Sequence, residues 1–315
     1  MKGIVLVPII LGVGLLAVGG TVAAIGYNNA IKTEAVTNTH EVSEEFSKVN
    51  IDVDISDVVF VTSENGEKKV VCEEEKEVVH TVKVENDTLT VTYDDQRAWY
   101  EKWFNWSFVK RSVKVYLPAT TYSDCVIHSS TGEVTVGSGF TFANMDVKTA
   151  TGNVKVSTQV TEDIKVNTST GNINVEKSNP TSLDIKSSTG NITLSDMEVQ
   201  DRITLKCSTG NIKADDIKAK SWESQCSTGG VSLTNTIVEK HMSVKTSTGE
   251  IRLNDCDAET LYLKSDTGSI KGTLLTSKDF YASSDTGKVT VPHSTTGGKC
   301  EIETDTGEIN ISIKE

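Results

Sequence analysis

Three copies of Asp-Thr-Gly lie near the C-terminal end of the sequence, and the first, Asp266-Thr267-Gly268-Ser269, matches the aspartic-protease signature. That chemistry needs two carboxylates that face each other across a pseudo-dyad and share one proton. Asp266, Asp285 and Asp305 instead occupy the same position of a tandem repeat. We expect them to stack on successive coils, so the match reflects the turn sequence of the repeat and does not predict a protease.

The same three aspartates are a candidate calcium site, because like charges stacked on one edge are unfavourable unless a cation bridges them. Hard cations want several oxygen ligands, however, and the glycine-rich nonapeptide of calcium-binding solenoids is absent. The five histidines are scattered without metal-ligand spacing. No phosphate loop, nucleophile elbow or paired-cysteine zinc motif occurs. The sequence therefore predicts no catalytic residues, no cofactor and no other metal site.

Lysine recurs four residues before the repeated glycine and is expected to form a column on the outer face. The column comprises Lys148, Lys186, Lys206, Lys245 and Lys264. A polyanion such as teichoic acid could bind to it. A solvated edge that discourages further strand pairing explains the same pattern.

Ten Thr-Gly pairs recur every 19 or 20 residues, and this fixed period predicts a repeat architecture in which each unit is too small to fold alone. The turn glycines are Gly132, Gly152, Gly171, Gly190, Gly210, Gly229, Gly249, Gly268, Gly287 and Gly307. Apolar residues lie at alternate positions on both sides of each glycine, which is the period of a half-buried strand. The fold class predicted is all-β: a single-stranded parallel β-solenoid of about ten coils.

A small residue always stands three places before the glycine, and we expect it to face inward at a narrow corner. Cys207 and Cys226 occupy this position, and Cys125, Cys256 and Cys300 fall at apolar positions. All five are expected to be buried free thiols that behave as small hydrophobic residues. Cys72 has no partner in the pattern.

The first segment has no charged residue from Ile4 to Tyr27 and is long enough to cross a membrane as a helix. Residues 1–27 are therefore predicted to be a transmembrane anchor, although small residues leave cleavage open, and residues 28–45 a polar linker. With Lys2 before the apolar segment, the rest of the chain is expected to be extracellular. The net charge of −13, with no basic stripe, argues against a nucleic-acid partner.

Residues 46–122 alternate apolar and polar residues without the Thr-Gly period, and are predicted to cap the repeats of residues 123–315. An aromatic insertion interrupts the cap. It is expected to be either a lid over the core or a surface for a partner. Its residues are Trp99, Tyr100, Trp103, Phe104 and Trp106.

The anchor, the aromatic insertion, the Val-Tyr-Leu-Pro segment at 115–118 and the Ser-Thr-Gly-Asn-Ile units together resemble the bacterial "putative adhesin" family, a domain of unknown function. The resemblance implies a parallel β-solenoid on a cell surface and supplies no catalytic residue. We expect a non-enzymatic, membrane-anchored protein that binds a cell-wall polymer or another envelope protein. The alternatives are a polysaccharide-active β-helix enzyme and a structural spacer without a ligand.

Overall fold

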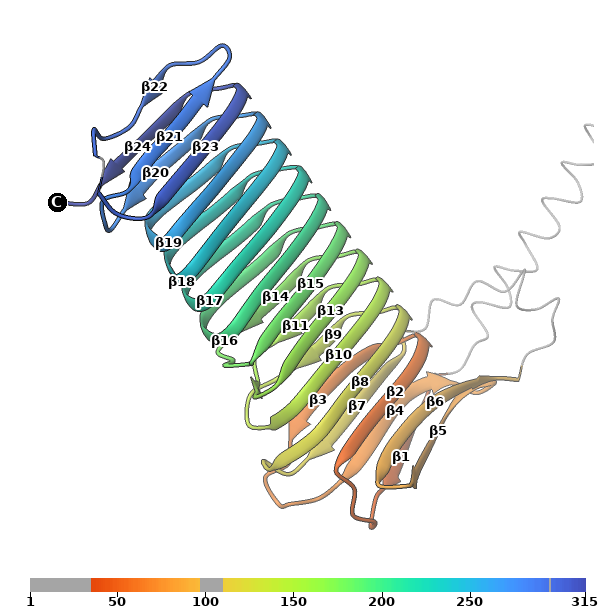
Figure 1. Cartoon of the computed structure of the whole chain (residues 1–315). Coiled ribbons are helices and arrows are strands. Elements are labelled where there is room, and N and C mark those ends of the chain that lie inside the picture. The colour runs from red at the N-terminus through yellow and green to blue at the C-terminus, as the bar shows by residue number, and fades with distance from the viewer. Residues whose placement is uncertain (1–34, 97–109, 295) are drawn as a thin grey trace, which may run out of the picture.

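The computed structural model describes residues 35–96, 110–294 and 296–315, and all their regular structure is β-strand. The described residues form an all-β parallel solenoid of about nine turns, close to the ten coils expected from the ten glycine corners. The solenoid is a rod with the first strands at one end (Figure 1). Within these ranges no helix is long and apolar enough to cross a membrane. The predicted anchor, residues 1–27, lies outside the described residues.

The N-terminal strands join antiparallel pairs to the start of the parallel stack. They are β1 (Ala35–Glu41), β2 (Lys48–Ile55), β3 (Asp57–Thr62), β4 (Lys69–Glu75), β5 (Val78–Glu85), β6 (Thr88–Asp95) and β7 (Ser112–Leu117). β4 pairs antiparallel with β1, β5 and β7, and β5 pairs antiparallel with β6. β2 lies parallel to both β6 and β8, whereas β3 lies parallel to β7 and β9. β1 begins within the segment predicted to be a linker.

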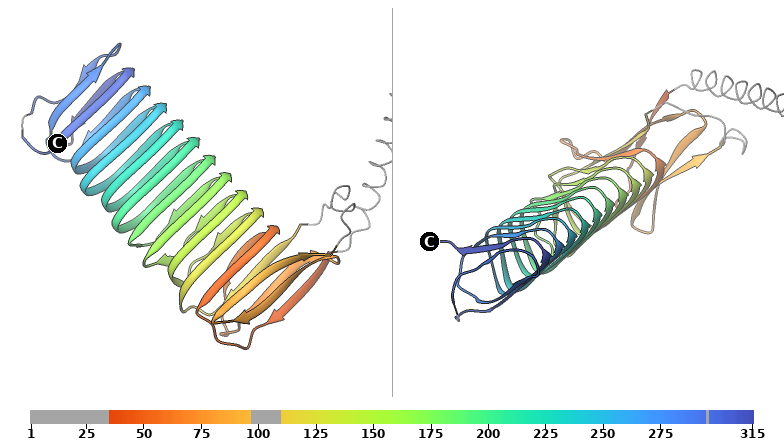
Figure 2. Two further views of the ribbon diagram at one scale, coloured as in Figure 1. Left: turned by 45° about the vertical axis from the view of Figure 1, so that its right-hand side comes forward. Right: turned by 90° about the horizontal axis from the view of Figure 1, so that it is seen from above.

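The repeats continue with parallel pairing only. Their strands are β8 (Thr121–Thr131), β9 (Val134–Val136), β10 (Thr141–Thr151), β11 (Val154–Val156), β12 (Gln159–Val160), β13 (Asp163–Thr170), β14 (Ile173–Glu176), β15 (Ser182–Thr189), β16 (Ile192–Thr209), β17 (Ile212–Thr228), β18 (Val231–Thr248) and β19 (Ile251–Thr267). The last strands are β20 (Ile270–Leu274), β21 (Asp279–Ser284), β22 (Val289–Thr290), β23 (Lys299–Thr306) and β24 (Ile309–Ile313). Both views in Figure 2 show one continuous stack.

The glycine corner is held by steric fit as well as by backbone conformation. Gly210 has a φ of 141°, and a Cβ added there would lie 2.2 Å from the carbonyl oxygen of Gly190 in the coil below. The small residue three places earlier has a second role, because its side chain donates to the glycine carbonyl of that coil. Thr246 Oγ1 donates to Gly229 O at 2.8 Å, and Ser265 Oγ to Gly249 O at 3.0 Å. The corner therefore requires both a glycine and a small donor.

A second corner follows six residues after each glycine in five of the coils. The residues there have a φ between 45° and 57°, a left-handed conformation that Asn and Asp adopt more readily than most residues. They are Lys177, Asp196, Asp216, Asn235 and Asp255. These five coils are thus closed by a glycine corner and by a second, mainly Asx corner that the sequence pattern did not reveal.

The six cysteines are all buried and free. Cys207 and Cys226 lie side by side in adjacent coils, as the repeat pattern predicts, and donate to Gly190 O and Gly210 O respectively. In these two coils a thiol makes the hydrogen bond to the glycine carbonyl that a hydroxyl group makes in other coils. The prediction of buried free thiols is confirmed.

The order of the coils at the C-terminal end differs from their order in the sequence. β23 lies between β19 and β21, and β24 between β20 and β22. The last segment of the chain therefore does not form the last coil of the rod. Cys300 and Ile309 of the inserted coil are fully buried, whereas the residues in register with them in the outer coil, Phe280 and Val289, are partly buried and 38% exposed, respectively. The more apolar segment is buried between two coils in this order, which explains why it lies inside the less apolar one.

A cross-linking pair tests this order. Glu303 lies opposite Lys264 on one side and Ser283 on the other. Neighbouring strands are about 4.8 Å apart, within disulfide range, whereas a two-strand separation of about 9.6 Å is not. We expect the Lys264→Cys, Glu303→Cys variant to form a disulfide under mild oxidation, measured by intact mass. The Lys264→Cys, Ser283→Cys variant is its matched control, and a disulfide in that control would contradict the inserted order.

Candidate functional site

The five repeated lysines lie in one column on an outer face, because parallel pairing keeps equivalent residues in register. In spatial order the column reads Asp52, His128, Lys148, Asn167, Lys186, Lys206, Gln225, Lys245, Lys264, Glu303 and Ser283. Two amides interrupt the lysines. Residues at both ends of the column are not basic, so the basic part covers only the middle of the rod.

Neighbouring carboxylates offset part of this positive charge. Lys148 Nζ lies 3.1 Å from Asp146 Oδ2, and Lys186 Nζ lies 3.0 Å from Asp184 Oδ2. The Lys264 ammonium lies 3.4 Å from Glu303 Oε2. The face is therefore of mixed charge, and it suits a polar ligand with hydroxyl groups better than it suits a polyanion.

A groove of about 300 Å³ opens on this face where the cap meets the repeats. Its polar lining includes Asp52, His128, Ser130, Lys148, Asn167 and Ser169. Two buried lining atoms, His128 Nε2 and Thr149 Oγ1, have no hydrogen-bond partner within the protein. Buried polar atoms are nearly always paired. Because both atoms have almost no exposed surface, a ligand in the groove could pair with them only if the neighbouring side chains moved.

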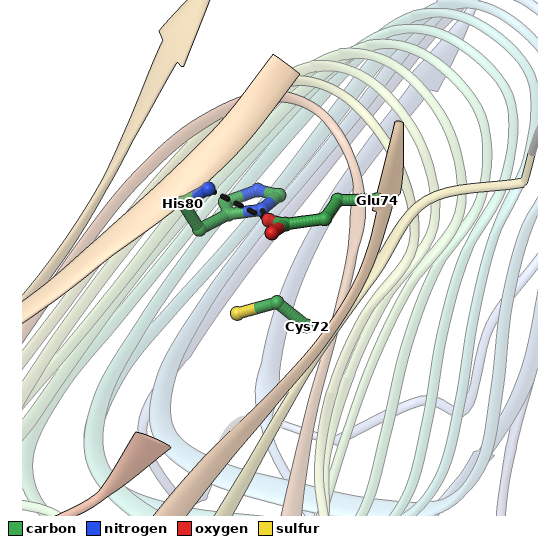
Figure 3. Close-up of side chains that lie close together, drawn as sticks. All are labelled: Cys72, Glu74 and His80. Atoms are coloured by element: carbon green, nitrogen blue, oxygen red, sulfur yellow. Dashed lines mark hydrogen bonds and ion pairs between the residues drawn. The ribbon is translucent and has the colours of Figure 1, made fainter. Parts of the chain in front are cut away.

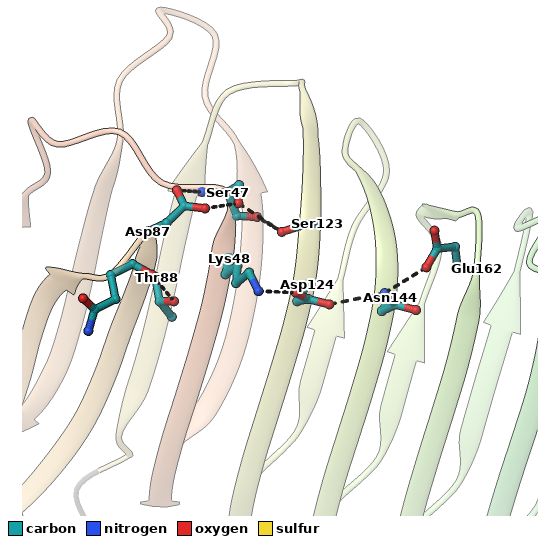
Figure 4. Close-up of polar contacts among 9 residues, drawn as sticks. Ser47, Lys48, Asp87, Thr88, Ser123, Asp124, Asn144 and Glu162 are labelled. Carbon is teal, nitrogen blue, oxygen red and sulfur yellow. Dashed lines mark hydrogen bonds and ion pairs between the residues drawn. The ribbon is translucent and has the colours of Figure 1, made fainter.

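Polar contacts near the beginning of the same strands join the cap to the first coils (Figure 4). Lys48 Nζ of β2 lies 3.1 Å from Asp124 Oδ2 of β8. Asn144 Nδ2 of β10 donates to Asp124 Oδ1 at 3.3 Å and to Glu162 Oε2 at 3.1 Å. Ser47 Oγ and Ser123 Oγ are 3.0 Å apart. These contacts keep the strands on both sides of the groove in fixed register.

The three aspartates of the candidate calcium site do lie in adjacent coils, but in the order Asp266, Asp305, Asp285. In the part of the chain that the structure describes, only one set of three acidic, histidine or cysteine residues brings its ligand atoms within 4.8 Å of one another, and it does not include these aspartates. The stack is a column of separate carboxylates. Calcium binding there stays a prediction.

The aromatic candidates Trp99, Tyr100, Trp103, Phe104 and Trp106 lie outside the described residues, so a partner surface there also stays a prediction. The remaining tryptophan, Trp222, is among the largest fully buried side chains. It lies on β17 and packs in the core of the solenoid.

Among the described residues, the one compact set of potential metal ligands is buried near the N-terminal end of the rod. The spacing of the histidines in the sequence did not reveal it. Cys72 and Glu74 lie two residues apart on the same side of β4, and His80 approaches them from β5 (Figure 3). His80 Nδ1 lies 2.7 Å from Glu74 Oε2. The available signal was a glutamate on the inward side of a strand, two residues after an inward cysteine.

Burial controls the protonation of this cluster. It raises the pKa of the Cys72 thiol to about 12, with a further contribution from the negative charge of Glu74. Burial also lowers the pKa of His80, although the hydrogen bond to Glu74 acts in the opposite direction. The protein alone therefore favours a thiol and a neutral imidazole.

Comparisons with known proteins give one family model and several solved structures that are similar to this chain. The family model described as Toastrack DUF4097 matches residues 46–202 and 198–315. A "putative adhesin" from Parabacteroides distasonis is similar, with 14% identity and a TM-score of 0.46 over 89% of this chain and 98% of that chain. A "putative adhesin" from Bacteroides fragilis has 15% identity and a TM-score of 0.41 over 89% and 97%. A "putative lipid binding protein" from Parabacteroides distasonis has 14% identity and a TM-score of 0.41, also over 89% and 97%. Comparison with curated proteins finds no match.

Proposed function

The chain belongs to the Toastrack DUF4097 family, and from that premise we propose that it is a non-enzymatic protein of the bacterial cell surface that binds a hydroxyl-rich polymer of the cell wall. An N-terminal transmembrane helix would hold the rod at the membrane with its solenoid outside. The polymer would lie in the groove lined by His128, Lys148 and Asn167 and continue along the outer face.

The groove is the observation that carries the proposal. It offers carboxylate, imidazole, ammonium, amide and hydroxyl groups within one short stretch of the rod. A polymer rich in hydroxyl groups can donate to Asp52 and accept from Lys148. Equivalent residues repeat at about 4.8 Å along the rod, so an extended chain could meet similar groups on successive coils.

The mixed charge of the outer face also supports a neutral or weakly charged part of the polymer as the ligand. Three of the five lysines in the column lie within 3.4 Å of a carboxylate oxygen. Exposed ion pairs of this kind contribute about 0–1 kcal/mol each, so a ligand hydroxyl can replace them at low cost. Binding by many weak polar contacts along a rod fits an adhesive role.

Sedimentation of the full chain with purified cell walls tests the proposal. We expect the wild-type chain to sediment with the walls, and Ser169→Trp, which fills the groove, to weaken binding at least about tenfold, or about 1.4 kcal/mol. Ser227→Trp is the matched control, because Ser227 is exposed at the same position of the repeat three coils away. It should bind as the wild type does.

Walls from which teichoic acid has been removed identify the polymer. Retained binding indicates the glycan, and lost binding indicates teichoic acid. A folded wild-type chain that binds neither kind of wall would contradict the proposal and favour a spacer. Equal binding by Ser169→Trp and Ser227→Trp would exclude the groove.

A further inference from the structure

The buried cluster on β4 and β5 contains the functional groups of two different kinds of site. His80 lies between a hydroxyl and a carboxylate: its Nε2 is 3.3 Å from Ser56 Oγ, and its Nδ1 is 2.7 Å from Glu74 Oε2. Serine hydrolases use this order of hydroxyl, imidazole and carboxylate. Ser56 is only 3% exposed, however, and Glu74 1%. A substrate carbonyl cannot reach the hydroxyl, so this geometry does not support a hydrolase.

The alternative is a metal centre. We propose that Cys72, Glu74 and His80 bind one zinc ion and so join β4 and β5 at the N-terminal end of the rod. The three ligand atoms already lie within 4.8 Å of one another. Ligand atoms around tetrahedral zinc lie about 3.3–3.7 Å apart, given Zn–N and Zn–O bonds of about 2.0–2.2 Å and a Zn–S bond of about 2.3 Å. Shifts of about 1 Å would complete the geometry.

The choice of zinc follows from the donor atoms and their charge. A thiolate, an imidazole and a carboxylate are all ligands that zinc accepts, whereas calcium and magnesium require oxygen donors. Two anionic ligands balance the charge of a divalent ion. The loaded site would therefore be neutral, which suits a site whose ligands are at most 4% exposed.

Polar residues around the cluster hold the ligands in the required orientation. Asn38 Nδ2 of β1 donates to Glu74 Oε1, which leaves Oε2 directed toward His80. Ser56 Oγ lies 3.3 Å from His80 Nε2. When His80 donates its Nε2–H to Ser56, the lone pair of Nδ1 faces the ligands, as in histidines whose second nitrogen is fixed by an outer partner.

His40 of β1 is a candidate for the fourth ligand, and its ring would have to move toward the cluster, because it does not belong to the set whose ligand atoms all lie within 4.8 Å of one another. Asn38 lies opposite Cys72 and His40 lies opposite Val70, so His40 and Cys72 share one side of the paired strands. His40 Nε2 is buried and has no hydrogen-bond partner within the protein. The imidazole of His40 would complete a Cys-Glu-His-His set.

Zinc would have a structural role at this position. Among the strands that the structure describes, β1 pairs only with β4. β5 diverges from β4 after one pair of residues, Glu75 and Val78. A metal bound by residues of all three strands would replace missing ladder contacts. It would also fix the strand that follows residues 1–34 against the rod. This inference does not rest on the wall-binding proposal.

Zinc titration of the full chain, after removal of metal with a chelator, is the direct test. We expect one zinc ion per chain by metal analysis, release of about one proton from the Cys72 thiol, and a higher melting temperature. Cobalt substituted for zinc should give a thiolate-to-metal charge-transfer band. Cys72→Ala should remove the band and weaken zinc binding at least about 100-fold.

Two further variants separate the ligands from their surroundings. Cys256→Ala, which removes another fully buried thiol, should bind zinc as the wild type does. Ser56→Ala should keep the cobalt band but lose about 10–100-fold in zinc affinity, as is typical when an outer partner of a ligating histidine is removed. A folded wild-type chain that retains no zinc would overturn the proposal. An unchanged cobalt band in Cys72→Ala would overturn it as well.

Discussion

Replacing Gly210 by valine is expected to destabilise the solenoid by at least about 4 kcal/mol, which is at the upper end for a single substitution. A Cβ at this position would lie 2.2 Å from the carbonyl oxygen of Gly190. The glycine also has a φ of 141°, which residues with a Cβ rarely adopt. The carbonyl oxygen belongs to the backbone and the position of Cβ is fixed by the backbone, so rotation of a side chain cannot relieve the contact.

The coils cannot move apart to accommodate the side chain. Gly210 N donates to Thr228 O at 2.9 Å, and Cys226 Sγ donates to Gly210 O at 3.1 Å. Separating two coils would break such contacts along the whole turn. Urea unfolding followed by circular dichroism gives the free energy of unfolding. Ser208→Val, an exposed position two residues earlier, is the control and should change it by less than about 0.5 kcal/mol. Equal stabilities of the two variants would contradict the stacked corner.

Replacing Arg111 by methionine is expected to cost about 3–5 kcal/mol, because it leaves a buried carboxylate without its partner. Arg111 Nε donates to Glu75 Oε1 at 2.9 Å, and Nη2 donates to the same oxygen. The two residues are 7% and 2% exposed. Methionine keeps much of the volume of arginine but provides no hydrogen-bond donor.

A second substitution distinguishes loss of the partner from loss of packing. In the double variant Arg111→Met, Glu75→Leu, neither charge of this ion pair remains, so most of the lost stability should return. Lys114→Met removes the partner of Glu73, an ion pair that is more than one-third exposed on both sides, and should cost less than about 1 kcal/mol. A double variant as unstable as Arg111→Met would show that packing around Arg111 matters more than its charge.

The sequence predicted the repeated part of the fold because its signals are local. Alternating apolar residues on either side of Thr-Gly determine which side of each strand is buried, and the repeat places equivalent residues in adjacent coils. The column from Lys148 to Lys264 follows directly from this register. The left-handed corner at Asp216 was missed, since a single Asp or Asn has many other uses in a sequence.

The order of the last coils could not be predicted from the repeat. Each of these coils carries the same Thr-Gly signal, so the pattern does not say whether Gly287 or Gly307 stacks on Gly268. The outcome depends on how much apolar surface each coil can cover. Ile302 is fully buried between β19 and β21, whereas Ala282, which is in register with it in the outer coil, is only partly buried.

The N-terminal cluster was missed for a different reason. Cys72 and His80 belong to strands without the repeat, and an antiparallel turn brings them together over a spacing that resembles no common zinc motif. The contribution of β1 depends on pairing over more than 30 residues, from Asn38 to Cys72. The groove likewise combines Asp52 of β2 with Lys148 of β10. Sites assembled from distant strands leave little trace in a local pattern.

Lysine acetylation of the full chain, with and without soluble cell-wall fragments, tests the wall-binding groove most directly. Mass spectrometry of the labelled peptides compares Lys148 in the groove with Lys218, an exposed lysine on another side of the coil. We expect the fragments to slow labelling of Lys148 and leave Lys218 unchanged. Unchanged labelling of Lys148 when the fragments are bound would place the binding surface elsewhere on the rod.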